Sequence, residues 1–221
     1  MIKYILLDFG KVLAYPTTGN WDITPKFLEL VDIDKIDIEK LKKCKQKYQY
    51  LLSEKIVTLE EEYNMFLNFY DSIFREYNYP DYKKEISEQI AYNRTYEFDK
   101  YKLYDNVKEE LKSLKEKYTL ILLSDNWPCV INFMKYYGIY DLFTKVYVSS
   151  IYGEEKKDKV FFDNPINDFN IKPNEAIFID DNEVLLDIAV SKGFEVRLMD
   201  REKRNLKSKY KVINNLNQIN D

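Results

Sequence analysis

Acidic side chains follow two apolar runs of this sequence directly. Asp8 comes after the run Tyr4–Leu7, and the adjacent pair Asp180-Asp181 comes after the run Ala176–Ile179. A carboxylate can act as a nucleophile, as a general acid or base, or as a ligand for a hard cation such as Mg²⁺. Two neighbouring acids are strongly destabilising unless a cation lies near them. These residues therefore predict carboxylate chemistry assisted by a cation.

Further polar residues follow two other apolar runs. Ser124-Asp125-Asn126 comes after Thr119–Leu123, and Gly153-Glu-Glu-Lys156 lies shortly after Val146–Val148. One acid at the end of a strand often only caps a helix or a turn, but four successive cases are hard to attribute to capping. The set suits a phosphate monoester. A carboxylate would attack phosphorus, Mg²⁺ would offset the repulsion between carboxylate and phosphate, and lysine, hydroxyl and backbone N–H groups would hold the phosphoryl oxygens.

Five short apolar runs predict the strands that position these residues. Most are nearly continuous in apolar residues, as in strands that are buried on both faces of a parallel sheet. Helical patterns lie between them, which predicts an α/β fold with a Rossmann-like, doubly wound parallel sheet. Ligands of such sheets bind outside the carboxyl ends of the strands. The five runs are Tyr4–Leu7, Thr119–Leu123, Val146–Val148, Ala176–Ile179 and Glu195–Leu198.

The segment from residue 16 to residue 101 interrupts this alternation, because it contains several helical patterns and no convincing strand. Thr58 and Glu61 have the spacing of a capping box at the start of a long apolar helix. We therefore expect residues 1–15 and 102–221 to form an α/β core, with 16–101 as a helical insertion after the first strand. The basic, then Asn-rich stretch Arg201–Asp221 carries no motif, and we expect it to be a solvated terminal strand or helix.

Composition excludes several classes of function. The chain has no histidine, which removes Ser-His-Asp and Cys-His catalysis and His-ligated zinc. Cys44 and Cys129 lie far apart in helical patterns, and we expect reduced thiols that are buried or half-buried. A net charge of -4 argues against a nucleic-acid partner. No apolar run approaches the roughly 18 residues of a membrane helix, and no secretory signal is visible, so we expect a cytoplasmic protein without a membrane partner.

Four motifs in this order resemble those of the haloacid dehalogenase superfamily of phosphohydrolases. The first is Asp8-Phe9-Gly10-Lys11-Val12, the second is Ser124, the third is Gly153-Glu-Glu-Lys156, and the fourth is Phe178-Ile-Asp180-Asp181-Asn182. The helical insertion lies where that superfamily has a helical cap. The sequence is most similar to bacterial sugar-phosphate phosphatases, which have a small helical cap, Asp-x-Gly-x-Val in the first motif and Asp-Asp-Asn in the fourth.

The resemblance implies a role for each matching residue. Asp8 would be the catalytic nucleophile and a Mg²⁺ ligand, and the backbone carbonyl of Gly10 would be a second ligand. Asp181 would bind the metal directly, and Asp180 directly or through water. Ser124 and the backbone N–H of Asp125 would bind phosphate. Lys156 would be catalytic and would pair with both phosphate and Asp8.

Two residues depart from the family pattern. Lys157 stands where many members have proline, which concerns the stiffness of the loop. Gly10 replaces the aspartate that normally protonates the leaving group and later activates water, an effect worth ~10²–10⁴-fold in rate. The metal contact at this position is a backbone carbonyl, so we expect an intact Mg²⁺ site without its proton donor. Lys11 could replace the donor, although a solvated or phosphate-facing role is favoured. Tyr15, Arg94 and Trp127 are candidates for the site or for structural roles.

The resemblance thus implies a Mg²⁺-dependent phosphatase that hydrolyses a small phosphorylated metabolite, such as a sugar phosphate, through an aspartyl-phosphate. Two alternatives remain open. One is a catalytically weakened relative that binds a phosphorylated ligand or a protein partner, which Gly10 would explain. The other is a 2-haloacid dehalogenase, against which the acidic pair Asp180-Asp181 counts because such enzymes lack it and need no Mg²⁺. A phosphomutase would need the acid that Gly10 replaces. The sequence does not indicate the substrate or the oligomeric state.

Overall fold

The predicted apolar runs form one parallel sheet in the computed structural model, which describes residues 1–52 and 55–220. The strand order is β5-β4-β1-β6-β7-β8, and each neighbouring pair is parallel. The five predicted strands and the α/β fold class are confirmed, and the short strand β8 lies in the terminal stretch for which a strand or helix was expected. The strands are β1 (Tyr4–Leu7), β4 (Thr119–Ser124), β5 (Lys145–Val148), β6 (Ala176–Asp180), β7 (Glu195–Met199) and β8 (Val212–Ile213).

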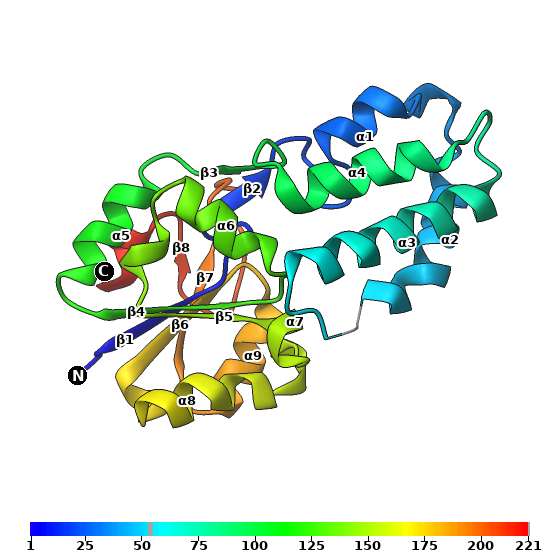
Figure 1. Ribbon diagram of the computed structural model, residues 1–221. Helices are drawn as coiled ribbons and strands as arrows, with labels where there is room; N and C mark the ends of the chain where they lie inside the picture. Colours follow the sequence, from blue (N-terminus) through cyan, green and yellow to red (C-terminus); the bar gives the residue numbers. More distant parts are fainter. Residues whose placement is uncertain (53–54, 221) are drawn as a thin grey trace. The chain divides into compact units, whose positions relative to one another are not determined.

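Helices cover both faces of this sheet, which explains the continuous apolar character of its strands. In Figure 1, α5 and α6 lie on one side of the sheet and α8 and α9 on the other. Leu6 of β1 is fully buried in a cluster that includes Phe178 of β6 and Leu186 of α9. The helices of this part of the chain are α5 (Val107–Lys115), α6 (Cys129–Tyr136), α7 (Ser149–Tyr152), α8 (Asp163–Phe169) and α9 (Glu183–Ser191).

The order of the strands places the end of β1 at a topological switch point. β1 lies between β4 and β6, and the chain continues outward to β5 on one side and to β7 on the other. Leu7, the last residue of β1, pairs with Leu122 of β4 and Ile179 of β6. Crevices at such points are the usual ligand sites of open α/β sheets. The residue that follows Leu7 is Asp8.

Contacts divide the chain into two compact units, residues 1–15 with 103–221 and residues 16–102. The second unit is helical. Thr58 and Glu61 form the predicted capping box of its longest helix. The tyrosines Tyr70 and Tyr77 of that helix are buried. The helices are α1 (Pro25–Leu30), α2 (Ile38–Tyr48), α3 (Leu59–Tyr77) and α4 (Lys84–Tyr96).

Several short elements were absent from the prediction. Strands β2 (Ala14–Pro16) and β3 (Tyr101–Leu103) form a separate two-stranded sheet where the chain passes between the two units. Three residues are too few to show an alternating pattern, so these strands could not be recognised from the residue types. Short 3-10 turns fill many connections: η1 (Ile33–Lys35), η2 (Gln49–Leu52), η3 (Tyr140–Leu142), η4 (Lys156–Asp158), η5 (Val160–Phe162), η6 (Pro173–Glu175) and η7 (Leu216–Asn220).

The expectation that residues from 201 onward are solvated was wrong for Arg201. Its side chain is only 5% exposed and pairs with Glu110 of α5. The partner lies 91 residues earlier in the chain, so a local charge pattern could not reveal it. The cysteine prediction is confirmed, since Cys44 and Cys129 are free and buried. Among the helices of the described residues, none has the length and apolar character needed to cross a bilayer.

The buried position of Leu6 gives a test of the core. Leu6→Ala should lower the free energy of unfolding by about 2–5 kcal/mol, because it removes buried methyl groups and leaves a cavity. Val190→Ala is a suitable control, since Val190 is 45% exposed on α9, and it should change stability by no more than about 0.5 kcal/mol. Urea unfolding at constant pH would measure both values. Equal effects of the two substitutions would contradict the assigned burial of β1.

Candidate active site

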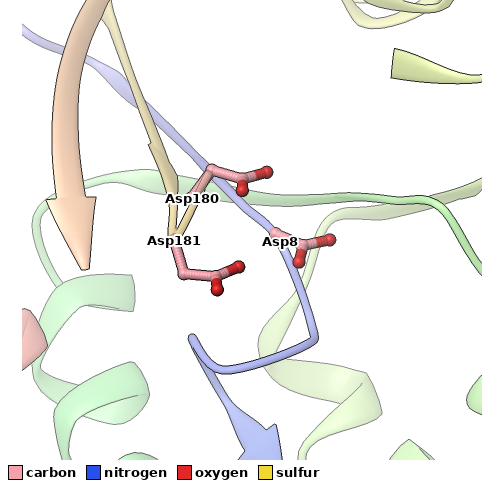
Figure 2. Close-up of side chains that lie close together, drawn as sticks. All are labelled: Asp8, Asp180 and Asp181. Atoms are coloured by element: carbon pink, nitrogen blue, oxygen red, sulfur yellow. The ribbon is translucent and has the colours of Figure 1, made fainter. Parts of the chain in front are cut away.

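Three carboxylates meet at the carboxyl edge of the sheet. Asp8 follows β1, Asp180 is the last residue of β6, and Asp181 follows it. Figure 2 shows their side chains pointing toward the same side of the two strands. One oxygen atom from each carboxylate lies within 4.8 Å of the others. The backbone N–H of Asp8 donates to the carbonyl of Ile179 at 3.0 Å, so the strand pairing itself sets the spacing of the acids.

Lys156 connects two of these acids. Its Nζ lies 2.8 Å from Oδ1 of Asp8 and 2.6 Å from Oδ2 of Asp180, and the residue is only 2% exposed. Burial alone would lower the pKa of Lys156, but the carboxylates of Asp180 and Asp8 outweigh burial and raise it. The lysine therefore keeps its proton and supplies a fixed positive charge between the two acids.

The two members of the acidic pair have different surroundings. Asp180 is 1% exposed, and its second oxygen accepts a hydrogen bond from the backbone N–H of Asn182 at 2.9 Å. Burial raises the pKa of Asp180 to about 7, although Lys156 acts in the opposite direction. Asp181 is more accessible, with 20% of its side chain exposed. Burial and the charge of Asp8 raise the pKa of Asp181, and Lys11 opposes the rise.

Residues at the carboxyl ends of β4 and β5 lie at the same edge of the sheet as the three carboxylates. Ser124 ends β4 and is 1% exposed. The side chain of Asp125 accepts a hydrogen bond from the backbone N–H of Lys156 at 2.9 Å, and burial raises the pKa of Asp125. The backbone N–H of Asn126 donates to Oγ of Ser149, the first residue after β5, at 3.0 Å. Of the predicted phosphate-binding residues, Ser124 and Asp125 thus lie at the end of β4, the strand beside β1, and Lys156 lies in a separate loop.

The loop that carries Lys156 begins at Gly153. Gly153 has a φ of 73°, a left-handed conformation in which glycine has no steric penalty, and it ends the short helix α7. Lys156 then begins the 3-10 turn η4, whose first turn is closed by reciprocal hydrogen bonds between Glu155 and Asp158. The motif pattern predicted that the lysine of this loop belongs to the site. It did not predict that the side chain of Asp125 would fix the backbone of that lysine.

The turn after Asp8 contains the residue that departs from the family pattern. Positive φ angles occur at four glycines, and Gly10 is not among them, so its backbone conformation does not require glycine. Lys11 does have a positive φ, of 54°. Its Nζ lies 3.4 Å from Oδ2 of Asp181, with 38% of the lysine side chain exposed. The sequence had suggested a solvated or phosphate-facing Lys11, and it did not reveal this ion pair.

The remaining candidates have contacts of their own. The ring of Tyr15 lies 4.8 Å from that of Tyr104. The backbone N–H of Trp127 donates to Oδ1 of Asn126 at 2.9 Å. Arg94 belongs to the helical unit, where it is 4% exposed, donates to the carbonyl of Trp21, and lies 4.6 Å from the ring centroid of Phe66. These contacts assign Arg94 a structural role within its own unit.

The cluster has the chemistry of a site for a hard divalent cation. Its donor atoms are carboxylate oxygens, which suit Mg²⁺. The carbonyl of Gly10, the further ligand that the resemblance implies, accepts none of the turn and loop backbone hydrogen bonds found among residues 1–52 and 55–220. When all three are ionised, Asp8, Asp180 and Asp181 carry three negative charges, against which Lys156 and Lys11 supply two positive charges. The excess negative charge and the oxygen donors fit a bound cation.

Comparison with known proteins agrees with this fold. The structure resembles a 2-haloacid dehalogenase from Pseudomonas syringae pv. Tomato DC3000, with a TM-score of 0.67, 15% identity, and coverage of 99% of this chain and 96% of that chain. For a HAD-hydrolase from Bacillus subtilis bound to magnesium, the TM-score is 0.67 at 14% identity, covering 98% and 96% of the two chains.

A third structure of the same fold is a HAD family enzyme from Bacteroides thetaiotaomicron in complex with magnesium and inorganic phosphate. Its TM-score is 0.57 at 20% identity, covering 90% of this chain and 95% of that chain. No curated protein sequence matches the chain. The family described as haloacid dehalogenase-like hydrolase matches residues 29–199, which is most of the chain. The protein therefore belongs to the haloacid dehalogenase-like hydrolases, as its motifs predicted.

Proposed function

We propose that this hydrolase is a Mg²⁺-dependent phosphatase that acts on a small phosphorylated metabolite, of which a sugar phosphate is the favoured class. The observation that carries the proposal is the convergence of Asp8, Asp180, Asp181 and Lys156 at the carboxyl edge of the sheet. Three acids around one buried lysine form a site for a cation and an anion together. A phosphate monoester with its metal ion meets that requirement.

The residues of the edge have distinct roles in this proposal. A carboxylate oxygen of Asp8 attacks phosphorus, the bond from phosphorus to the leaving oxygen breaks, and an aspartyl-phosphate forms. Water then attacks phosphorus, and the bond to Asp8 breaks, which releases inorganic phosphate. Lys156 holds Asp8 in place and neutralises charge on a phosphoryl oxygen. Ser124 and the backbone N–H of Asp125 bind the other phosphoryl oxygens.

The metal-binding residues would be Asp8, the carbonyl of Gly10, Asp181 and, directly or through water, Asp180. Bound Mg²⁺ would offset the repulsion between Asp8 and the phosphate and stabilise charge on the transferring group. Asp180 already uses its two oxygens for Lys156 and for the N–H of Asn182, which favours a contact through water. Two structures of the same fold contain magnesium, one of them with inorganic phosphate.

The resemblance to dehalogenase structures supports a competing reaction, in which Asp8 attacks carbon and halide leaves. That reaction needs no divalent cation. The accessible acid Asp181, next to Asp180, is the feature that favours the phosphatase, because a further carboxylate beside the nucleophile serves a cation. The absence of an acid at Gly10 restricts the proposed phosphatase to substrates with good leaving groups, such as an anomeric sugar phosphate.

Asp8→Asn should reduce the Mg²⁺-dependent hydrolysis of p-nitrophenyl phosphate on the order of 10³-fold or more, because the amide is not a nucleophile. Removal of Mg²⁺ with EDTA should have a similar effect. Asp187→Asn is the control, since Asp187 lies on α9 and pairs with Lys209 away from the cluster. A screen of phosphorylated metabolites would then identify the substrate.

Other results of these assays would favour the alternatives. Full activity of Asp8→Asn would refute the assigned nucleophile. Halide release from a 2-haloacid without added metal would identify a dehalogenase. Mg²⁺-dependent binding of BeF₃⁻ or vanadate, without turnover of any phosphate ester, would indicate a relative that binds a phosphorylated ligand and does not hydrolyse it.

Gly10→Asp tests the missing proton donor. The substitution should accelerate cleavage of alkyl phosphates by about 10²-fold and leave p-nitrophenyl phosphate nearly unchanged, because only the poor leaving group needs a proton. Gly10→Asn is the matched control, with the same shape and no acid. Steady-state kcat/KM values for both ester types would be compared. Equal rates for the two variants would mean that another group already supplies the proton.

The raised pKa of Asp180 predicts a pH-dependent effect of Mg²⁺ on stability. In the metal-free protein this pKa is about 7, whereas an unfolded chain would have a value near 4. As pH rises from about 4 to about 7, the unfolded chain releases this proton and the folded chain retains it, so folding becomes less favourable. Mg²⁺ takes the place of the proton and should therefore raise Tm more at pH 8 than at pH 5.5.

The metal-free protein should also lose stability relative to its Asp180→Asn variant between pH 5 and pH 8, as measured by urea unfolding in EDTA. Asp187→Asn should not reproduce this trend. The hydrogen bond from Lys209 lowers the pKa of Asp187, so its contribution is present above pH 4 and is lost at lower pH. An equal increase in Tm with Mg²⁺ at both pH values would contradict the assigned role of Asp180.

A further inference from the structure

Arg201 makes three hydrogen bonds through one buried guanidinium group. Its Nη1 and Nη2 atoms donate to Oε1 and Oε2 of Glu110, at 3.1 and 2.7 Å. Its Nε donates to the backbone carbonyl of Val12 at 2.9 Å. Arg201 follows β7, Glu110 lies on α5, and Val12 lies in the turn after Asp8. The group therefore links three segments that are distant in sequence.

The pairing with Glu110 fixes the direction of the third hydrogen bond. Both side chains are nearly inaccessible, with 5% and 4% exposed. A guanidinium bound to a carboxylate through two parallel hydrogen bonds is held in the plane of that carboxylate. Oε2 of Glu110 also accepts from the backbone N–H of Leu216 at 3.4 Å, which restrains the carboxylate itself. The Nε of Arg201 is thus fixed relative to the sheet and directed at Val12.

The turn that contains Val12 begins at the proposed nucleophile. The N–H groups of Leu13 and Ala14 both donate to the carbonyl of Phe9, at 2.9 and 3.1 Å. The N–H of Tyr104 donates to the carbonyl of Leu13 at 3.0 Å. Lys11, in the middle of the turn, has the left-handed conformation that non-glycine residues adopt only when their surroundings impose it. The N–H of Lys11 also donates to the carbonyl of Ala14 at 2.7 Å, so hydrogen bonds inside the turn hold it together. The contacts at Val12 and Leu13, including that of Arg201, attach this turn to the rest of the core.

We propose that Arg201 is a positioning residue for the metal site. Held by Glu110, it fixes the carbonyl of Val12 and with it the turn that presents the carbonyl of Gly10 beside Asp8. It touches neither metal nor substrate. This inference rests on the proposed function, because it assigns the Gly10 carbonyl to the cation. The role parallels that of residues behind metal ligands, whose loss commonly weakens metal binding by about 10–100-fold.

The test removes the hydrogen bond to Val12 without leaving a buried charge. The double variant Glu110→Met, Arg201→Met replaces the ion pair by apolar side chains, an exchange that often preserves or increases stability. Binding of Mg²⁺ to the substrate-free protein, measured by calorimetry, should weaken by about tenfold. Amide hydrogen exchange should become faster in the peptide that covers residues 9–14. Tm in EDTA should stay close to the wild-type value.

Tyr147→Phe is the control for a general loss of stability. It removes the partly buried hydrogen bond from the buried residue Tyr147 to Asp168, 2.7 Å long, and Tyr147 has no role at the site. It should leave Mg²⁺ affinity unchanged. Wild-type affinity in the double variant, or an equal loss of affinity in Tyr147→Phe, would overturn the role of Arg201 alone. Absence of Mg²⁺ binding by the wild-type protein would overturn the proposed function, and the positioning role with it.

Discussion

The arrangement at the carboxyl edge depends on one ion, the buried ammonium group of Lys156. Asp8 and Asp180 end adjacent strands, so their separation is set by the spacing of the sheet, and both are shielded from water. Two carboxylates so placed would not both remain ionised without a nearby cation. Lys156 supplies that charge at 2.8 and 2.6 Å. The side chain of Asp125 accepts a hydrogen bond from the backbone N–H of Lys156. Charged groups therefore connect the ends of β1, β4 and β6 with the loop that carries Lys156.

The parts of this site that follow from local sequence could be predicted. The strands β1 and β6 are covered by helices on both faces, and this burial leaves a continuous apolar run in the sequence. The polar residues Asp8, Ser124 and Asp180 each end such a run or follow it. Parallel strands bring their carboxyl ends to one edge, so the sequence implied the convergence once the sheet was recognised. The motif pattern also predicted the family.

Other parts depend on contacts between distant residues and leave no local signal. In the sequence, Glu110 has the position of an ordinary exposed acid of an amphipathic helix. Arg201 has the position of a solvated residue in a basic terminal stretch. Only the packing of α5 against the segment after β7 buries them together. The pair of Lys11 and Asp181 depends in the same way on the left-handed turn at Lys11. Strands β2, β3 and β8 have only two or three residues, fewer than any periodicity requires.

The raised pKa of Asp180 has a consequence for the charge of the whole molecule. The sequence contains no histidine, and ordinary carboxyl, lysine and arginine side chains do not titrate between about pH 6 and 8. The outer surface of the protein therefore keeps nearly the same charge across this range. The net charge of the cluster around Asp180 changes, because Asp180 loses its proton there. Solubility and non-specific association follow surface charge and should be insensitive to pH there. Sensitivity to acid near neutrality is thus concentrated at the place where the cation and the substrate would bind.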